Sequence, residues 1–106
     1  MEFEWDAAKE ARNVEKHGIS FVAAAQVLES GTAFSAESDR GGERRWIAVG
    51  IHPATRKAIA VVYTERGGRC RIISARRAHQ DEEEEYRRRI ARRTSESPEG
   101  TQGDPG

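Results

Sequence analysis

The sequence contains one cysteine and no long apolar run. Cys70 alone cannot form an intramolecular disulfide, which suits the reducing cytosol. The longest strongly apolar stretch, AIAVVY at residues 58–63, is far too short to span a bilayer. The first residues, MEFEWDAAKE, are acidic and lack the apolar segment of a signal peptide. We therefore expect a soluble cytoplasmic protein with no membrane association.

The chain also lacks the patterns of common catalytic and metal sites. It has no P-loop, no paired CxxC, no HExxH and no nucleophile elbow. The histidines, His17, His52 and His79, are scattered, and none has a Cys or His neighbour at the spacing of metal ligands. We expect neither a metal nor any other cofactor.

The net charge of zero conceals an uneven distribution of charge. The 106 residues allow one small domain, and 18 basic side chains balance 18 acidic ones. Residues 1–40 carry a net charge of −4, whereas residues 41–78 carry +7. Residues 79–93 are neutral, and residues 94–106 carry −3. A neutral chain with a basic middle predicts a local surface that binds polyanions.

Local signals predict three helices. Asp6 is a suitable N-cap for a first helix, and Gly18 stands where that helix would end. Ser20 can cap a second helix that ends at Gly31. A third helix, DEEEEYRRRIARR at residues 81–93, has acids in its first turn and arginines in its last, which complements the helix dipole.

Strands are predicted between the second and third helices. Their ranges are 32–38, 44–51, 57–65 and 69–76, of which the first is weak. The connections are too short for crossovers, so the strands should form an antiparallel meander. The first five residues alternate in polarity and fit either a short strand or an anchoring arm.

These elements together predict an α+β fold. We expect two N-terminal helices, an antiparallel sheet of three or four strands and a C-terminal helix, all within residues 1–93. From residue 94 the sequence TSESPEGTQGDPG is polar and rich in glycine and proline. Residues 94–106 are therefore predicted to be a disordered tail.

The last predicted strand is unusually rich in arginine. Strict alternation assigns Arg69, Arg71, Ile73, Ala75 and Arg77 to one face, and Cys70, Ile72, Ser74 and Arg76 to the other. Neither face is cleanly apolar, so at least one arginine should lie against the sheet. The neighbouring strand ends with Tyr63, Thr64 and Glu65, which add a ring and a carboxylate. Metal-free RNA cleavage needs such groups: a base, an acid and cations.

The residues alone leave simpler interpretations open. Arginines on small sheets are often solvated or ion-paired, and Glu65 could be such a partner. Tyr63 could be a core or rim residue, and His17 could contact the C-terminal carbonyls of its helix. Cys70 is most simply a small buried apolar residue.

Three blocks of the sequence resemble those of the BrnT family of toxins. They are FEWDAAKEARNVEKHGISF at 3–21, RWIAVG at 45–50 and VVYTERGGRCRIISARRA at 61–78, and Tyr86 falls where the family has a tyrosine. The resemblance implies a RelE-like fold and a ribonuclease toxin of a type II toxin–antitoxin system that arrests growth by inhibiting translation. It also implies a BrnA-type ribbon-helix-helix antitoxin, usually in a heterotetramer that represses its own operon. The toxin would then reach operator DNA only through the antitoxin.

The resemblance also implies a set of site residues. Arg76 and Arg77 would bind the scissile phosphate of the RNA substrate, and His17 or Glu65 would act as general base or acid. The residues that would contact the rest of the RNA are Lys16, Arg45, Trp46, Tyr63, Arg66, Arg71 and Ser74. The alternative is a protein without catalysis, either an RNA-binding module or a degenerate toxin that acts as a transcriptional corepressor with its antitoxin.

Overall fold

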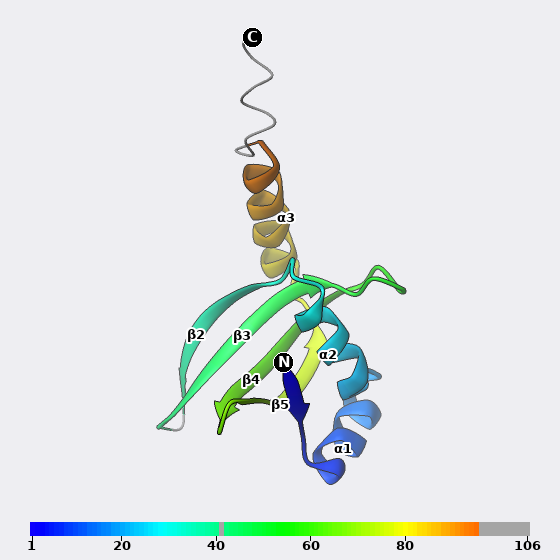
Figure 1. Ribbon diagram of the computed structural model, residues 1–106. Helices are drawn as coiled ribbons and strands as arrows, with labels where there is room; N and C mark the ends of the chain where they lie inside the picture. Colours follow the sequence, from blue (N-terminus) through cyan, green and yellow to red (C-terminus); the bar gives the residue numbers. More distant parts are fainter. Residues whose placement is uncertain (41, 96–106) are drawn as a thin grey trace.

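The computed structural model describes residues 1–40 and 42–95 (Figure 1). The elements are β1 (Glu2–Glu4), α1 (Ala7–His17), α2 (Phe21–Glu29), β2 (Phe34–Arg40), β3 (Glu43–Ile51), β4 (Ala58–Arg66), β5 (Arg69–Arg77) and α3 (Gln80–Ser95). Helix α3 therefore includes the first two residues of the predicted tail, and the rest of that tail lies outside the described residues. Within the described part of the chain, no helix is long and apolar enough to cross a membrane.

The sheet has five strands in the order β1-β5-β4-β3-β2. Strands β2 to β5 form the expected antiparallel meander, but β1 pairs with β5 in parallel. The prediction of a purely antiparallel sheet of three or four strands was therefore wrong. The sequence reveals neither the partner nor the direction of so short a strand, because β1 joins the free edge of a strand that follows most of the chain.

Both N-terminal helices begin and end as the local signals predict. The Asp6 carboxylate accepts a hydrogen bond from the Lys9 N–H at 2.9 Å, and the Ser20 hydroxyl accepts one from the Ala23 N–H at 3.1 Å. Gly18 closes α1 with a φ of 71°, and its N–H donates to the Val14 carbonyl at 2.8 Å. These caps satisfy backbone groups at the helix ends and fix where α1 and α2 start.

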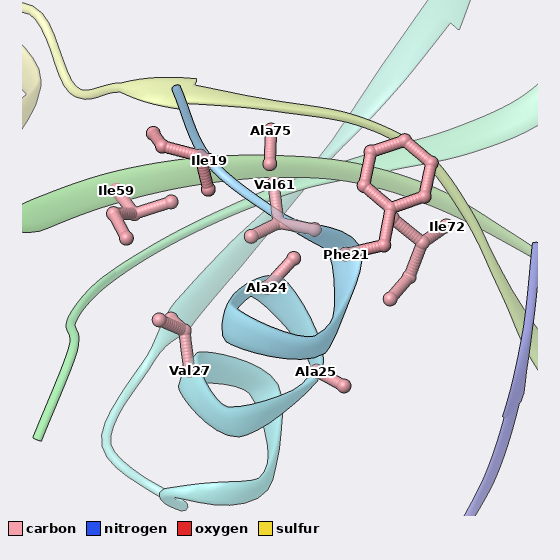
Figure 2. Close-up of a cluster of buried hydrophobic side chains, with 9 residues drawn as sticks. All are labelled: Ile19, Phe21, Ala24, Ala25, Val27, Ile59, Val61, Ile72 and Ala75. Atoms are coloured by element: carbon pink, nitrogen blue, oxygen red, sulfur yellow. The ribbon is translucent and has the colours of Figure 1, made fainter. Parts of the chain in front are cut away.

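The core lies between α2 and one face of the sheet (Figure 2). Its members are Ile19, Phe21, Ala24, Ala25 and Val27 from α2 and the turn before it, and Ile59, Val61, Ile72 and Ala75 from β4 and β5. Phe21 is fully buried, and burial of such a side chain contributes about 1.5–3 kcal/mol. Gly50 lets α2 approach β3, because a Cβ there would lie only 2.8 Å from a Val27 methyl carbon.

Strand β5 contains a β-bulge that changes which residues share a face. Val62 pairs with Ser74, and the next pair joins Tyr63 to Ile72, so Ile73 has no partner. The face toward α1 and α2 consequently carries Cys70, Ile72 and Ala75, and the opposite face carries Arg69, Arg71, Ser74 and Arg76. The assignment from strict alternation was wrong because one extra residue shifts the period.

Helix α3 lies on the other side of the sheet from α1 and α2, near the start of β2 and the end of β3, and projects beyond the sheet (Figure 1). Its Tyr86 is buried and packs edge-on against Phe34 of β2, with ring centroids 5.8 Å apart. The guanidinium of Arg93 lies over the same Phe34 ring at 4.7 Å. The rest of α3 is strongly charged. The helix covers only one end of this face of the sheet.

Candidate functional site

A hollow of about 350 Å³ lies between α1 and β5. We call it the basic groove, and its lining residues are Lys9, Arg12, Asn13, Lys16, His17, Ile73 and Ser74. Helix α1 forms one wall, and the bulge of β5 forms the other. Two of the blocks that resemble the BrnT family, at residues 16–17 and 73–74, thus meet at one place.

Asn13 holds the two walls together. Its side-chain amide donates hydrogen bonds of 2.8 Å to the Ile19 and Ala75 carbonyls, and its oxygen accepts one of 3.1 Å from the Ala75 N–H. Asn13 is only 7% exposed. Sequence reasoning missed this residue, although an asparagine within a helix is a usable signal because it favours the helical state poorly.

The basic groove is positively charged. Lys9, Arg12 and Lys16 follow each other at helical spacing and are exposed, and His17 is exposed beside them. None of the described residues that line the groove is acidic. Within residues 1–40 and 42–95, Lys9, Arg12 and Lys16 also have no carboxylate at ion-pair distance. An anion can therefore bind there without displacing an internal partner.

The predicted RNA-binding arginines of the sheet are ion-paired. Arg71 contacts Glu4 at 3.2 Å, and Arg66 contacts Glu43 at 3.1 Å. Arg45 also lies near Glu43, at 3.8 Å, and its buried Nε atom has no hydrogen-bond partner among the described residues. All three arginines lie on the sheet face opposite α1 and α2, and therefore not in the basic groove.

Arg76 forms an ion pair with Glu82. The two side chains form a bidentate pair with N–O distances of 2.9 and 3.0 Å, and Glu82 also accepts a hydrogen bond from the His79 N–H at 2.7 Å. The hydrogen bond from Arg76 is the main reason why the pKa of Glu82 falls to about 2, and the same bond raises the pKa of Arg76. This pair ties the end of β5 to the start of α3.

The remaining predicted catalytic residues lie apart. Arg77 is exposed and, two residues beyond Ala75, points to the face of α1 and α2. Glu65 pairs with Cys70 near the β4–β5 turn, about 13 Å along the strand from Ser74. Burial, with a smaller effect of the Glu65 charge, raises the pKa of the Cys70 thiol to about 11. Of the four predicted catalytic residues, only His17 lies in the basic groove.

Trp46 and Tyr63 lie together on the face toward α1 and α2. Their rings stack with centroids 5.8 Å apart and an interplanar angle of 19°, and the Tyr63 hydroxyl hydrogen-bonds to the Ser35 hydroxyl at 3.0 Å. Tyr63 also packs against the core. The two rings predicted to contact RNA therefore stack on each other.

Sequence reasoning missed a second hollow, of about 310 Å³, between α3 and strands β2 and β3. Phe34, Ala36, Ile47, Val49 and Tyr86 give it an apolar floor, and Asp81, Glu82 and Glu85 lie at its rim with Arg89. Its acidic rim suits a phosphate less well than the basic groove does. Within the described ranges, no three His, Cys, Asp or Glu residues are close enough to hold a metal ion.

Comparison with known proteins gives one family. The model of the family described as "Ribonuclease toxin, BrnT, of type II toxin-antitoxin system" matches residues 5–82, which run from the turn before α1 into the first turn of α3. No curated protein matches the chain. The matched range includes both walls of the basic groove.

Proposed function

Because the chain belongs to the BrnT family of ribonuclease toxins of type II toxin–antitoxin systems, we propose that it cleaves RNA without a metal ion and so inhibits translation and arrests growth. The observation that supports this most directly is the convergence of Lys16, His17 and Ser74 in the basic groove. The His17 imidazole and the Lys16 ammonium, both on α1, are thereby available to one phosphate, and Ser74 lines the β5 edge of the same groove.

The proposed reaction is internal transfer at one phosphodiester. The 2′-hydroxyl loses its proton to a base and its oxygen attacks the adjacent phosphorus, the bond to the 5′-oxygen breaks as that oxygen takes up a proton from an acid, and the products are a 2′,3′-cyclic phosphate and a 5′-hydroxyl. An imidazole nitrogen can accept or donate a proton, so His17 serves as the general base or acid. Lys16 donates hydrogen bonds to the non-bridging oxygens, where negative charge increases in the transition state, and Ser74 contacts the RNA from the β5 edge of the groove.

The other predicted site residues take secondary roles in this proposal. Arg77 adds positive charge on the same side of the sheet, and Arg76 reaches a phosphate only after its pair with Glu82 opens. Between the two residues proposed for proton exchange, the geometry favours His17 over Glu65. The residues proposed to contact RNA on either face of the sheet are Arg45, Trp46, Tyr63, Arg66 and Arg71, and the arginines among them would exchange a carboxylate for a phosphate.

The type II system implies an antitoxin, and we propose that it is a BrnA-type ribbon-helix-helix protein that forms a heterotetramer with this toxin. Operator DNA would then be bound through the antitoxin. Co-expression of a neighbouring small reading frame of that type should restore growth and yield a stable complex on purification. Absence of such a neighbour, or a neighbour that does not bind, would contradict this part of the proposal.

The central test replaces His17. We expect the wild-type chain, induced alone, to arrest growth and the purified protein to cleave RNA equally well with and without EDTA. His17→Ala should lower the cleavage rate by about 100-fold, since general acid–base catalysis contributes at least that much. End analysis should find 2′,3′-cyclic phosphates.

The matched control is His79→Ala, which removes an exposed histidine outside the groove. It should cleave RNA at a rate close to that of the wild type. Normal growth despite ample folded protein would refute the toxin function, and loss of cleavage in EDTA would refute metal independence. An equal loss of rate in both histidine variants would remove His17 from the mechanism.

The pairing of the sheet arginines favours one alternative, a toxin relative that binds RNA or its antitoxin without cleavage. In that case Arg66, Arg71 and Arg76 would serve stability, as their ion pairs do now. The same assay decides: RNA that is bound but remains intact would support this alternative.

A further inference from the structure

The basic groove extends along α1 beyond the residues assigned to the reaction. Lys9 and Arg12 line it together with Lys16, and no predicted role accounts for them. We propose that Lys9 and Arg12 form a binding track for the backbone phosphates of the RNA strand that leads to the reacting phosphate. This inference rests on the proposed function, since it assumes that RNA enters the groove.

The spacing of the cations fits a strand rather than a single ion. Lys9 and Lys16 are seven residues apart, which is about 10 Å along a helix, and Arg12 lies between them on the same face. That length exceeds one phosphate group. All three side chains are exposed, so each can reach a different phosphate along the strand.

The acids of α1 do not neutralise this face. Asp6 accepts a hydrogen bond from the Lys9 backbone N–H at 2.9 Å, and Glu10 accepts one from the Phe21 N–H at 3.0 Å. Asp6 and Glu10 are thus used to cap α1 and the helix that follows it. Glu15, the other acid of α1, is exposed, and none of the three lines the groove, so the cations remain available.

Helix α1 is also a firm support for such a track. It is capped at both ends, and Asn13 fixes its middle to β5 through buried hydrogen bonds. A phosphate held by Lys9 or Arg12 is therefore positioned relative to the β5 wall of the groove. An acidic protein segment could also be attracted to this charge, but the continuity of the track with His17 favours RNA.

The test measures RNA binding without cleavage. A single-stranded 2′-O-methyl oligoribonucleotide cannot undergo attack by a 2′-hydroxyl, so fluorescence anisotropy gives its affinity directly. We expect the double variant Lys9→Gln/Arg12→Gln to bind about tenfold more weakly at low salt. The slope of log affinity against log salt should fall in magnitude by about 1.4, since each phosphate contact on a single strand contributes about 0.7.

The matched control removes the same charge elsewhere. Arg56→Asn/Lys57→Gln alters two exposed cations in the β3–β4 turn, and asparagine tolerates the positive φ of 64° at residue 56. This control should bind with the slope of the wild type. Equal losses in the two double variants would overturn the track, because only the total charge would then matter.

Cleavage assays distinguish a failure of this inference from a failure of the proposed function on which it rests. For a ribodinucleotide, which is too short to reach Lys9, the groove variant should keep the wild-type rate, whereas its KM for long RNA should rise. If the wild type binds the oligonucleotide but cleaves nothing, the proposed function fails while the track stands. If the variant binds RNA normally and loses only antitoxin binding, the surface serves an acidic protein and the inference is wrong.

Discussion

Helix α1 and strand β5 each present a row of cations, and the two rows differ in what surrounds them. On β5, Arg71 faces Glu4 across the sheet, and Arg76 is held by Glu82 of α3. On α1, Lys9 and Lys16 have no carboxylate at ion-pair distance within the described residues. A phosphate must displace a carboxylate to bind Arg71 or Arg76, but it can bind Lys9 or Lys16 directly.

The difference shows that the abundance of arginine is a poor guide to where an anion binds. The excess positive charge in the sequence lies in residues 41–78, but much of it is matched by acids from β1, β3 and α3. Exposed ion pairs contribute little to stability, yet they do occupy the cation. The less basic N-terminal region supplies the groove that remains open.

The largest expected effect on stability comes from removing the hydrogen bonds that hold α1, with its row of cations, against β5. Asn13→Ala removes three buried hydrogen bonds and leaves the Ala75 N–H and two carbonyls without partners. We expect the free energy of unfolding to fall by about 3 kcal/mol, measured by urea denaturation. RNA binding should weaken as well, since the two walls of the groove separate.

The control for this change lies on the same helix. Arg12→Ala removes an exposed side chain without a buried hydrogen bond and should alter the free energy of unfolding by less than about 0.5 kcal/mol. A loss below 1 kcal/mol for Asn13→Ala would mean that α1 is held by its other contacts.

An intermediate effect is expected at the link between β5 and α3. Glu82→Gln removes the charge that Arg76 contacts and should lower the free energy of unfolding by about 2 kcal/mol. The pKa of Glu82 is depressed from 4.5 to about 2, so the pair stabilises the fold fully above pH 4.5 and progressively less as the pH falls toward 2. The variant should lack this part of the acid sensitivity, as measured by thermal unfolding across that range.

Glu83→Gln is the matched control, because Glu83 pairs with Arg87 one turn along the exposed surface of α3. Its effect should stay within about 0.5 kcal/mol. Identical acid profiles for the wild type and Glu82→Gln would show that the pair does not contribute to the pH dependence of stability.

The smallest effect tests whether pairing hides the sheet arginines. Glu43→Gln releases Arg45 and Arg66 from their ion pairs. It should tighten binding of the uncleavable oligonucleotide by about threefold, because an exposed ion pair contributes a free energy of about that size. The control, Glu29→Gln, removes an exposed acid at the end of α2 with the same change in net charge. Equal affinities in the two variants would mean that the sheet does not contact RNA even when its arginines are free.

The parts of the fold that could be predicted from the sequence are those encoded locally. Asp6, Gly18 and Ser20 set the helix ends through contacts within a few residues, and short connections dictate the meander. The bulge at Ile73 could not be predicted, because it exists only in the register between β4 and β5. The place of β1 was open for the same reason, since Glu4 meets Arg71 across 67 residues of sequence.

The candidate site was predicted only in part. Lys16, His17 and Ser74 were identified by resemblance, and the fold brings these three together. Lys9 and Arg12 were overlooked because nothing in their local sequence distinguishes a groove from an ordinary solvated helix face, whereas Asn13, a poor helix former inside a helix, was a signal that was not used. The pairing of Arg76 with Glu82 depends on how α3 leaves the sheet, which no local pattern describes.

The parallel pairing of β1 with β5 has a consequence for the order in which the protein is made. The first strand and α1 are synthesised early, but their partner strand starts at Arg69. Nascent domains emerge from the ribosome N-terminus first, so α1 waits for most of the chain before its groove has a second wall. A chain that stops before residue 73 lacks the bulge and Ser74 altogether. Under the proposed function, an activity that depends on the groove would therefore arise only after β5 has been synthesised.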